Sequence, residues 1–212
     1  MIEHKTVSLA DQVFEHLETD ILSGKYNRGE ILTESKLSAE LGVSRTPIRE
    51  ALRRLEQEHL IEDSGKGSVV IGVTEKDLED IYLIREQIEC LVASMAAENR
   101  TDEQLAELKE ILELQEFYLA KQDADHIKKM DNKFHNKMYE LSGSIVFYDT
   151  LLPLHKKTQK YRKASMQSNS RATASVEEHR KIYDAVALGD SELAAKYAKE
   201  HVENAFNHIK KG

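Results

Sequence analysis

The apolar positions divide the chain into two differently patterned parts, and the first part consists of short segments separated by turns. Val13, Leu17 and Ile21 recur every four residues, which is the spacing of one face of an α-helix. Gly24 follows directly after this run and is typical of a helix C-terminus. We therefore expect the first helix over residues 8–23.

Two further helices and a pair of strands complete the first part. The pattern predicts a short helix from Thr33 to a turn at Gly42, then a helix over residues 45–58 capped by Ser44. Apolar runs at residues 60–62 and 68–71 predict two strands joined by a glycine-containing turn. This order of elements is typical of a winged helix-turn-helix.

Beyond residue 73 the apolar positions recur every three or four residues, as in amphipathic helices, and no segment has the pattern of a strand. We predict a mainly α-helical protein with a winged helix-turn-helix domain over residues 1–73 and an antiparallel six-helix bundle over residues 74–212. The six helices are expected over residues 74–99, 101–121, 125–141, 145–164, 175–189 and 191–209, with a polar loop over residues 166–173.

Composition restricts the class of protein further. The chain has 212 residues, 40% of them hydrophobic, and a formal net charge of -8. An acidic chain is not a general nucleic-acid coat protein, so any DNA contact must come from a local basic patch. No apolar run approaches the roughly 18 residues of a membrane span, the N-terminus lacks the apolar core of a signal peptide, and Cys90 has no internal partner. We expect a cytoplasmic protein with no membrane association.

The predicted helix over residues 45–58 carries such a basic patch. Arg45, Arg49 and Arg53 share one arc of the helix, while an apolar arc beside them packs on the preceding helices. Arginine on an exposed recognition helix can bond guanine edges in a major groove, and Ser44 and Thr46 lie where a helix N-terminus binds phosphate. The alternative is an ordinary solvated face on which glutamates neutralise the arginines.

The motif in this region resembles the GntR family of bacterial transcription regulators. The resemblance rests on Leu-Thr-Glu-Ser-Lys-Leu at residues 32–37 and on Leu-Gly-Val-Ser-Arg-Thr-Pro-Ile-Arg-Glu-Ala-Leu-Arg-Arg-Leu at residues 41–55. It implies that Arg45 and Arg49 contact bases or phosphates and that Gly67 lets the wing approach the minor groove. Many members carry an arginine where this chain has Ser35. The residues expected to contact a double-stranded operator are Arg45, Arg49, Arg53, Ser44, Thr46, Lys36, Lys66 and Gly67.

The second part places four metal-ligating side chains on inward faces. Asp131 and His135 are four residues apart on one helix, and His179 and His201 each lie on the apolar stripe of another helix. A single buried histidine is usually a satisfied core residue, but three with a carboxylate favour a divalent metal such as Zn²⁺ or Ni²⁺. The remaining histidines are expected at the surface or rim: His4, His16, His59, His126, His155 and His208.

The resemblance extends over this second part, which looks like the FadR branch with its FCD-type ligand domain. It implies a metal at the four positions and a small carboxylate effector that completes the coordination. Arg85 falls inside an apolar stripe, where it either pairs with Glu89 four residues later or grips the effector carboxylate. Tyr82, Tyr139 and Arg162 are further candidates for effector contacts.

The sequence thus predicts a transcription regulator, with repression as the common sense in the family, that binds a near-palindromic operator as a homodimer and responds to a small organic acid. Two rivals remain. The first is a metal-dependent enzyme built in a helical bundle, which would leave the winged helix unexplained. The second is a DNA-binding regulator whose metal is purely structural. We expect no enzymatic activity.

Overall fold

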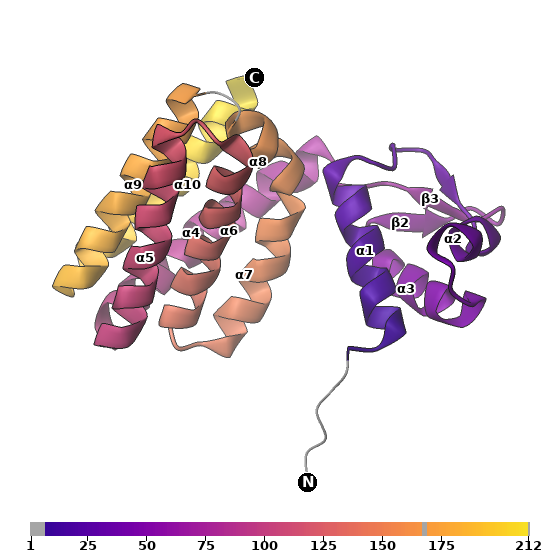
Figure 1. Cartoon of the computed structure of the whole chain (residues 1–212), viewed down its shortest axis with the longest axis horizontal. Coiled ribbons are helices and arrows are strands. Elements are labelled where there is room, and N and C mark those ends of the chain that lie inside the picture. Colours follow the sequence, from indigo (N-terminus) through magenta and orange to yellow (C-terminus); the bar gives the residue numbers. More distant parts are fainter. Residues whose placement is uncertain (1–6, 167–168, 212) are drawn as a thin grey trace, which may run out of the picture. The chain divides into compact units, whose positions relative to one another are not determined.

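A computed structural model describes residues 7–166 and 169–211 of the chain (Figure 1). The described residues divide into two compact units, with the boundary between Glu75 and Lys76. Helices predominate in both units, and the strands gather in one small sheet of the first unit.

The first unit is a winged helix-turn-helix, as the sequence predicts. Ser8 and Asp11 form a capping box that starts the first helix. The interior is apolar, and side chains such as Leu17 and Ile48 are fully buried in it. The elements are α1 (Leu9–Ser23), α2 (Glu34–Leu41), α3 (Arg45–Gln57), β1 (Ile31–Leu32), β2 (Ile61–Asp63) and β3 (Ser68–Val70).

Two details of this unit differ from the prediction. The wing is a three-stranded antiparallel sheet in the order β1-β3-β2, because the two-residue strand β1 pairs with β3 through Ile31 opposite Val69. A strand of two residues is too short to show alternation in sequence. Ser44 occupies the N-cap position of α3, but its side chain makes no capping hydrogen bond. Ser44 is therefore at the predicted position, but the prediction that its side chain caps the helix is wrong.

The second unit is a helical bundle in which α5, α6 and α7 lie side by side (Figure 1). Its described residues form seven helices, so the prediction of six is wrong. The elements are α4 (Glu75–Asn99), α5 (Asp102–Ala120), α6 (Ala124–Leu141), α7 (Ile145–Lys157), α8 (Gln159–Met166), α9 (Asn169–Leu188) and α10 (Ser191–Lys211).

The extra helix arises because the segment expected as one helix over residues 145–164 breaks at Thr158. The Thr158 side chain is fully buried, and its hydroxyl donates to the His155 carbonyl at 2.8 Å. A side chain that bonds a carbonyl of the preceding turn competes with the helical hydrogen-bond ladder. The chain then starts again as α8.

The polar loop expected over residues 166–173 is also wrong for the residues that the structure describes. Residues 167 and 168 lie outside the described residues, and α9 begins at Asn169. Arg171 is buried there and its guanidinium bonds both carboxylate oxygens of Glu178 at 2.9 Å. Residues 169–173 at the start of α9 show no apolar stripe, so the periodicity of the sequence does not indicate that they are helical.

No helix in the described part of the chain is long and apolar enough to cross a membrane. The core of the second unit is an apolar cluster that includes Phe134, Leu108 and Leu112. The second unit also buries a group of polar side chains contributed by α4, α5, α6, α7, α8, α9 and α10.

Gly67 supports a prediction about the stability of the wing. Its φ is +139°, and a Cβ added there would lie 2.7 Å from the Leu32 carbonyl oxygen of β1. We expect Gly67→Ala to lower the free energy of unfolding of the first unit by about 3 kcal/mol, through backbone strain and this clash. Amide hydrogen exchange in α1 and α3 would measure it for this unit alone.

Gly65 provides the control for this variant. It also has a positive φ, +72°, but a Cβ there would meet nothing within 4 Å. Gly65→Ala should therefore cost about 1 kcal/mol, from the backbone conformation alone. Equal losses in the two variants would contradict the close approach of β1 as the reason for Gly67.

Candidate metal centre and nucleic-acid interface

Three histidines from three helices converge inside the second unit. His135 lies on α6, His179 on α9 and His201 on α10, and each is at most 4% exposed. Each offers a ring nitrogen, and these three atoms lie within 4.8 Å of one another. The structure therefore brings together the three histidines that the sequence placed on inward faces.

A second layer of oxygen atoms fixes the orientation of each ring. A ring whose Nδ1–H is held by an oxygen acceptor presents the lone pair of its Nε2 to the interior, the usual arrangement of metal-binding histidine. The Nε2 of His179 is buried and has no hydrogen-bond partner among the described residues. The atoms that face Nδ1 are Gln115 Oε1, 2.9 Å from His179, Glu178 Oε2, 2.7 Å from His201, and Glu89 Oε2, 3.5 Å from His135.

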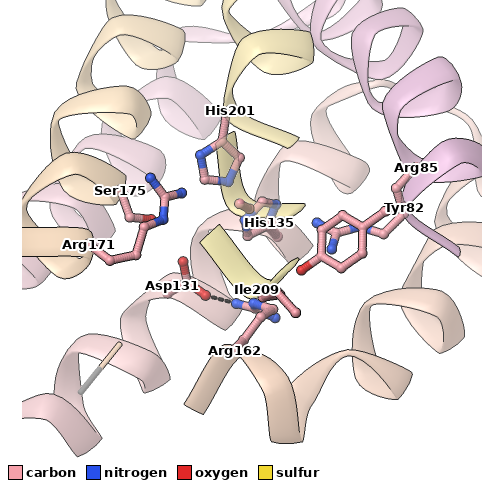
Figure 2. A pocket seen from close by; sticks show the side chains of 10 residues that line it. Tyr82, Arg85, Asp131, His135, Arg162, Arg171, Ser175, His201 and Ile209 are labelled. Carbon is pink, nitrogen blue, oxygen red and sulfur yellow. Dashed lines mark ion pairs between the residues drawn. The ribbon is translucent and has the colours of Figure 1, made fainter. Parts of the chain in front are cut away.

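Asp131 lies beside this group, one turn before His135 on α6. Its Oδ1 is 3.7 Å from His179 Nε2. Its Oδ2 forms an ion pair with the guanidinium of Arg162 on α8, which Figure 2 marks with a dashed line. The fourth predicted ligand is therefore in place, with an arginine on its far oxygen.

Burial keeps the imidazoles neutral. Desolvation lowers the pKa of His201 to about 4, and it holds the pKa of His179 well below its ordinary value. Desolvation also lowers the pKa of His135. At neutral pH each ring therefore has a free lone pair, which a divalent metal requires. Three neutral imidazoles, one carboxylate and an orphaned Nε2 together fit such an ion.

Glu178 and Glu89 remain ionised although they are buried. Burial raises the pKa of the Glu178 carboxyl, but hydrogen bonds from His201 and Arg171 outweigh it and hold the pKa at about 2. The pKa of Glu89 lies well below its ordinary value because the Arg85 guanidinium and His135 outweigh desolvation. Anionic acceptors at Nδ1 make the opposite nitrogen a better electron donor.

Sequence reasoning missed His155, which it placed at the surface or rim. The side chain is 3% exposed, and it forms a second group of possible ligands with Glu89 and His135. It follows Leu151 by one helical turn, and both are buried. The two lysines that follow it, Lys156 and Lys157, conceal this inward position in the sequence. Of the other histidines, His16, His59 and His126 are exposed and His208 is half-buried, while His4 lies outside the described residues.

Arg85 adopts the intrahelical pairing that the sequence left as one of two alternatives. Its Nε donates to Glu89 Oε1 at 2.7 Å, and the Tyr139 hydroxyl donates to the same oxygen at 2.8 Å. The Nη1 of Arg85 has no hydrogen-bond partner among the described residues. Half of the fork is therefore still available to a ligand.

A cavity opens beside the histidines (Figure 2), with about 310 Å³ of empty space that includes its opening to solvent. Three of the four predicted effector residues line it, whereas Tyr139 lines a neighbouring cavity of about 270 Å³. Arg171 and Ser175 also face the first cavity, and the sequence did not single them out because they lie in a stretch without an apolar stripe. The lining residues are Tyr82, Arg85, Asp131, His135, Arg162, Arg171, Ser175, His201, Ala205 and Ile209.

In the first unit, α3 exposes the three predicted arginines, Arg45, Arg49 and Arg53. Arg49 does not pair with a glutamate of its own helix. Its Nε and Nη2 donate to the two carboxylate oxygens of Glu34 on α2, at 2.8 and 2.9 Å. The pair is exposed, so it orients the guanidinium and contributes little to stability.

The remaining predicted DNA contacts lie around α3 and the wing. Ser44, Thr46, Lys36 and Lys66 are exposed, and Lys36 pairs with a glutamate of the preceding turn. The Ser44 hydroxyl is not used in capping, so it is free to meet a phosphate. Gly67 is required by the packing of β1 on β3, in addition to any approach to DNA.

Comparison with known proteins agrees with this architecture. Residues 9–71 match the family described as bacterial regulatory proteins, gntR family, and residues 80–204 match the FCD domain. The uncharacterised HTH-type transcriptional regulator YdhC of Bacillus subtilis is 29% identical over 201 residues, which cover 94% of this chain and 90% of YdhC. The gluconate operon transcriptional repressor of Bacillus licheniformis is 41% identical over 119 residues, 56% of this chain and 49% of that repressor.

A solved structure shares the fold. McbR/YncC of E. coli superposes with a TM-score of 0.83 at 24% sequence identity, covering 97% of this chain and 99% of that one. Both domains, their order and the relatives lead to one conclusion. The chain belongs to the GntR family, in the FadR-like branch with an FCD domain, and is a DNA-binding transcription regulator rather than an enzyme.

Proposed function

We propose that this regulator is a cytoplasmic repressor whose operator affinity is controlled by a small carboxylate effector bound beside a divalent metal in the FCD domain. The observation that carries the proposal is the set of three neutral, buried imidazoles with Nδ1 held by oxygen acceptors and ring nitrogens within 4.8 Å. Buried polar groups without a partner cost free energy, so their convergence in this interior favours a bound ion.

Asp131, His135, His179 and His201 would hold the metal, and their nitrogen and oxygen atoms suit Zn²⁺ or Ni²⁺. The bound ion would supply positive charge and an open coordination position for an anionic group of the effector. Glu178, Gln115 and Glu89 keep the three rings oriented toward the common centre.

The donors that line the cavity would bind the effector. Arg162 contacts Asp131 and faces the cavity, so its planar fork is placed to bond a carboxylate there. Arg85 and Tyr82 face the same cavity from α4. Tyr139 would act indirectly, because its hydroxyl bonds Glu89 and thereby holds Arg85.

On the DNA side, we propose a homodimer that places two α3 helices in successive major grooves of a near-palindromic operator. Arg45, Arg49 and Arg53 would meet the bases and phosphates, with Ser44, Thr46 and Lys36 beside them. Lys66 and Gly67 would bring the wing to the minor groove. The exposure of this basic face supports the assignment.

The metal site gives a prediction about its second layer. Glu178→Gln keeps the size of the side chain and its contacts but removes the negative charge that faces both His201 Nδ1 and Arg171. We expect about a 10- to 100-fold loss of Zn²⁺ affinity, since outer partners of ligating histidines typically contribute that much. Competition with a chelator measures it on the full-length protein.

The matched control is Glu116→Gln, which removes an exposed carboxylate that pairs with Arg180 on the outer face of α9. It should bind Zn²⁺ as the unchanged protein does. Equal affinity in Glu178→Gln and the unchanged protein would contradict the site. Thermal stabilisation by Zn²⁺ with no further response to any organic acid would favour a purely structural metal.

The recognition helix gives a second prediction. An operator is first selected from a random pool of duplex DNA with the unchanged protein. Arg45→Ala should weaken binding to this operator by about 10- to 100-fold, because one bidentate arginine–guanine contact is worth about 1–3 kcal/mol. Fluorescence anisotropy at fixed salt measures the change.

Arg180→Ala is the control here, because it removes the same charge from the second unit, on α9. It should leave operator binding unchanged. If both variants bind equally well, Arg45 does not read the operator.

A further inference from the structure

The cavity beside the histidines contains buried hydrogen-bond donors that nothing in the protein satisfies. Tyr82 Oη, Arg85 Nη1 and Ser175 Oγ have no hydrogen-bond partner among the described residues, and their side chains are at most 1% exposed. An unsatisfied buried donor typically costs about 1–3 kcal/mol. Three of them around one cavity indicate a ligand that accepts hydrogen bonds.

These donors lie at two separate ends of the cavity. Figure 2 shows Tyr82 and Arg85 together on one side, Ser175 with Arg171 on the other, and His135 and His201 between them. Tyr82 and Arg85 are three residues apart on α4 and therefore share a face. Ser175 is one turn before His179 on α9, so the end that carries Ser175 lies next to His179 and is called the histidine end.

The charged side chains of the cavity wall are neutralised in pairs, in part by carboxylates that lie behind the wall. Arg85 pairs with Glu89, Arg162 with Asp131 and Arg171 with Glu178. Imidazoles that ligate a metal are uncharged, so a divalent ion would leave two uncompensated positive charges in a buried site, which is costly. A ligand with two negative charges restores neutrality, whereas one with a single charge does not.

The size of the cavity limits the ligand to a small molecule. Its empty space of about 310 Å³ includes the part that is open to solvent, so the enclosed space is smaller still and a ligand that reaches both ends must be short. A single compact anion would satisfy the donors at one end and leave the other end unpaired. A short molecule with one anionic group at each end would satisfy the donors at both ends.

We propose that the effector is a small dicarboxylic acid that spans this cavity. Its first carboxylate lies at the histidine end, where it accepts a hydrogen bond from the Ser175 hydroxyl. Its second carboxylate accepts hydrogen bonds from Arg85 Nη1 and from the Tyr82 hydroxyl. The inference rests on the proposed function, because it specifies the chemical class of the effector at that same site.

The test compares acids that differ in the second carboxylate alone. Malonate, succinate and glutarate are titrated calorimetrically into the Zn²⁺-loaded full-length protein, beside propionate, butyrate and valerate, which have the same chain lengths. We expect at least one dicarboxylate to bind at least about tenfold more tightly than its monocarboxylate, since bonds to charged groups contribute about 1.5–3 kcal/mol.

Tyr82→Phe identifies the end at which the second carboxylate binds. The variant removes the unsatisfied hydroxyl but keeps the ring, which stacks on Phe206 with centroids 5.0 Å apart. It should weaken the best dicarboxylate by about fivefold and leave the monocarboxylates unchanged. Tyr148→Phe is the control, because Tyr148 packs on the apolar core away from the cavity lining.

The outcomes separate this inference from the proposed function. Equal affinity for dicarboxylates and monocarboxylates, or equal losses for both in Tyr82→Phe, overturns the two-ended ligand and leaves the carboxylate effector standing. Tighter binding of inorganic phosphate than of any dicarboxylate also overturns it. If none of the six acids binds the Zn²⁺-loaded protein, both the effector site and the dicarboxylate are wrong.

Discussion

The interior of the FCD domain is organised by the requirement that each buried charge has a partner. Arg85 pairs with Glu89, Arg171 with Glu178 and Arg162 with Asp131, and all six side chains are buried or nearly so. Removal of one partner would leave a desolvated charge, which typically costs about 3–5 kcal/mol. The pairs must therefore be kept or replaced as units.

Members of these pairs also contact residues of other helices. Glu89 of α4 accepts from Tyr139 of α6, and Glu178 of α9 contacts His201 of α10. Arg162 of α8 reaches Asp131 of α6. Buried ion pairs are weak evidence for stability, because apolar side chains of similar volume often stabilise a fold equally well. Their presence is better explained by what they hold in position, namely three imidazoles and a set of hydrogen-bond donors.

The sequence reveals those parts of the site that coincide with an apolar pattern. Asp131 and His135 are one turn apart, and His179 and His201 lie on apolar stripes, so their inward direction follows from periodicity. That Gln115 and Glu178 meet the outer nitrogens depends on the packing of three helices and has no local signal. The pairing of Arg49 with Glu34 likewise joins two helices across 15 positions.

The parts that the sequence missed share one physical cause. A helix that lines a polar cavity shows polar residues on both of its faces, so it reads as a loop. Arg171 stands in such a stretch, Ser175 is the first residue of the helix predicted over residues 175–189, and His155 is followed by two lysines. The break at Thr158 has a related origin, because a buried hydroxyl there bonds the carbonyl three residues before it. Functional sites are the places where local pattern and global fold are expected to disagree.

The connection between the two units limits how a ligand in the bundle can affect DNA binding. The helix α4 begins at Glu75, directly at the boundary between the units, and it carries Tyr82 and Arg85 two to three turns later. Tyr82 and Arg85, which would bind the second carboxylate of the proposed effector, thus lie on the helix that follows directly after the winged domain. A ligand alters an equilibrium only through a difference in its affinity for the two states. In the proposed complex, a change in α4 that alters the reach of Tyr82 and Arg85 would also act on the segment that joins the two units, so α4 is the element through which we propose that effector binding is coupled to DNA binding.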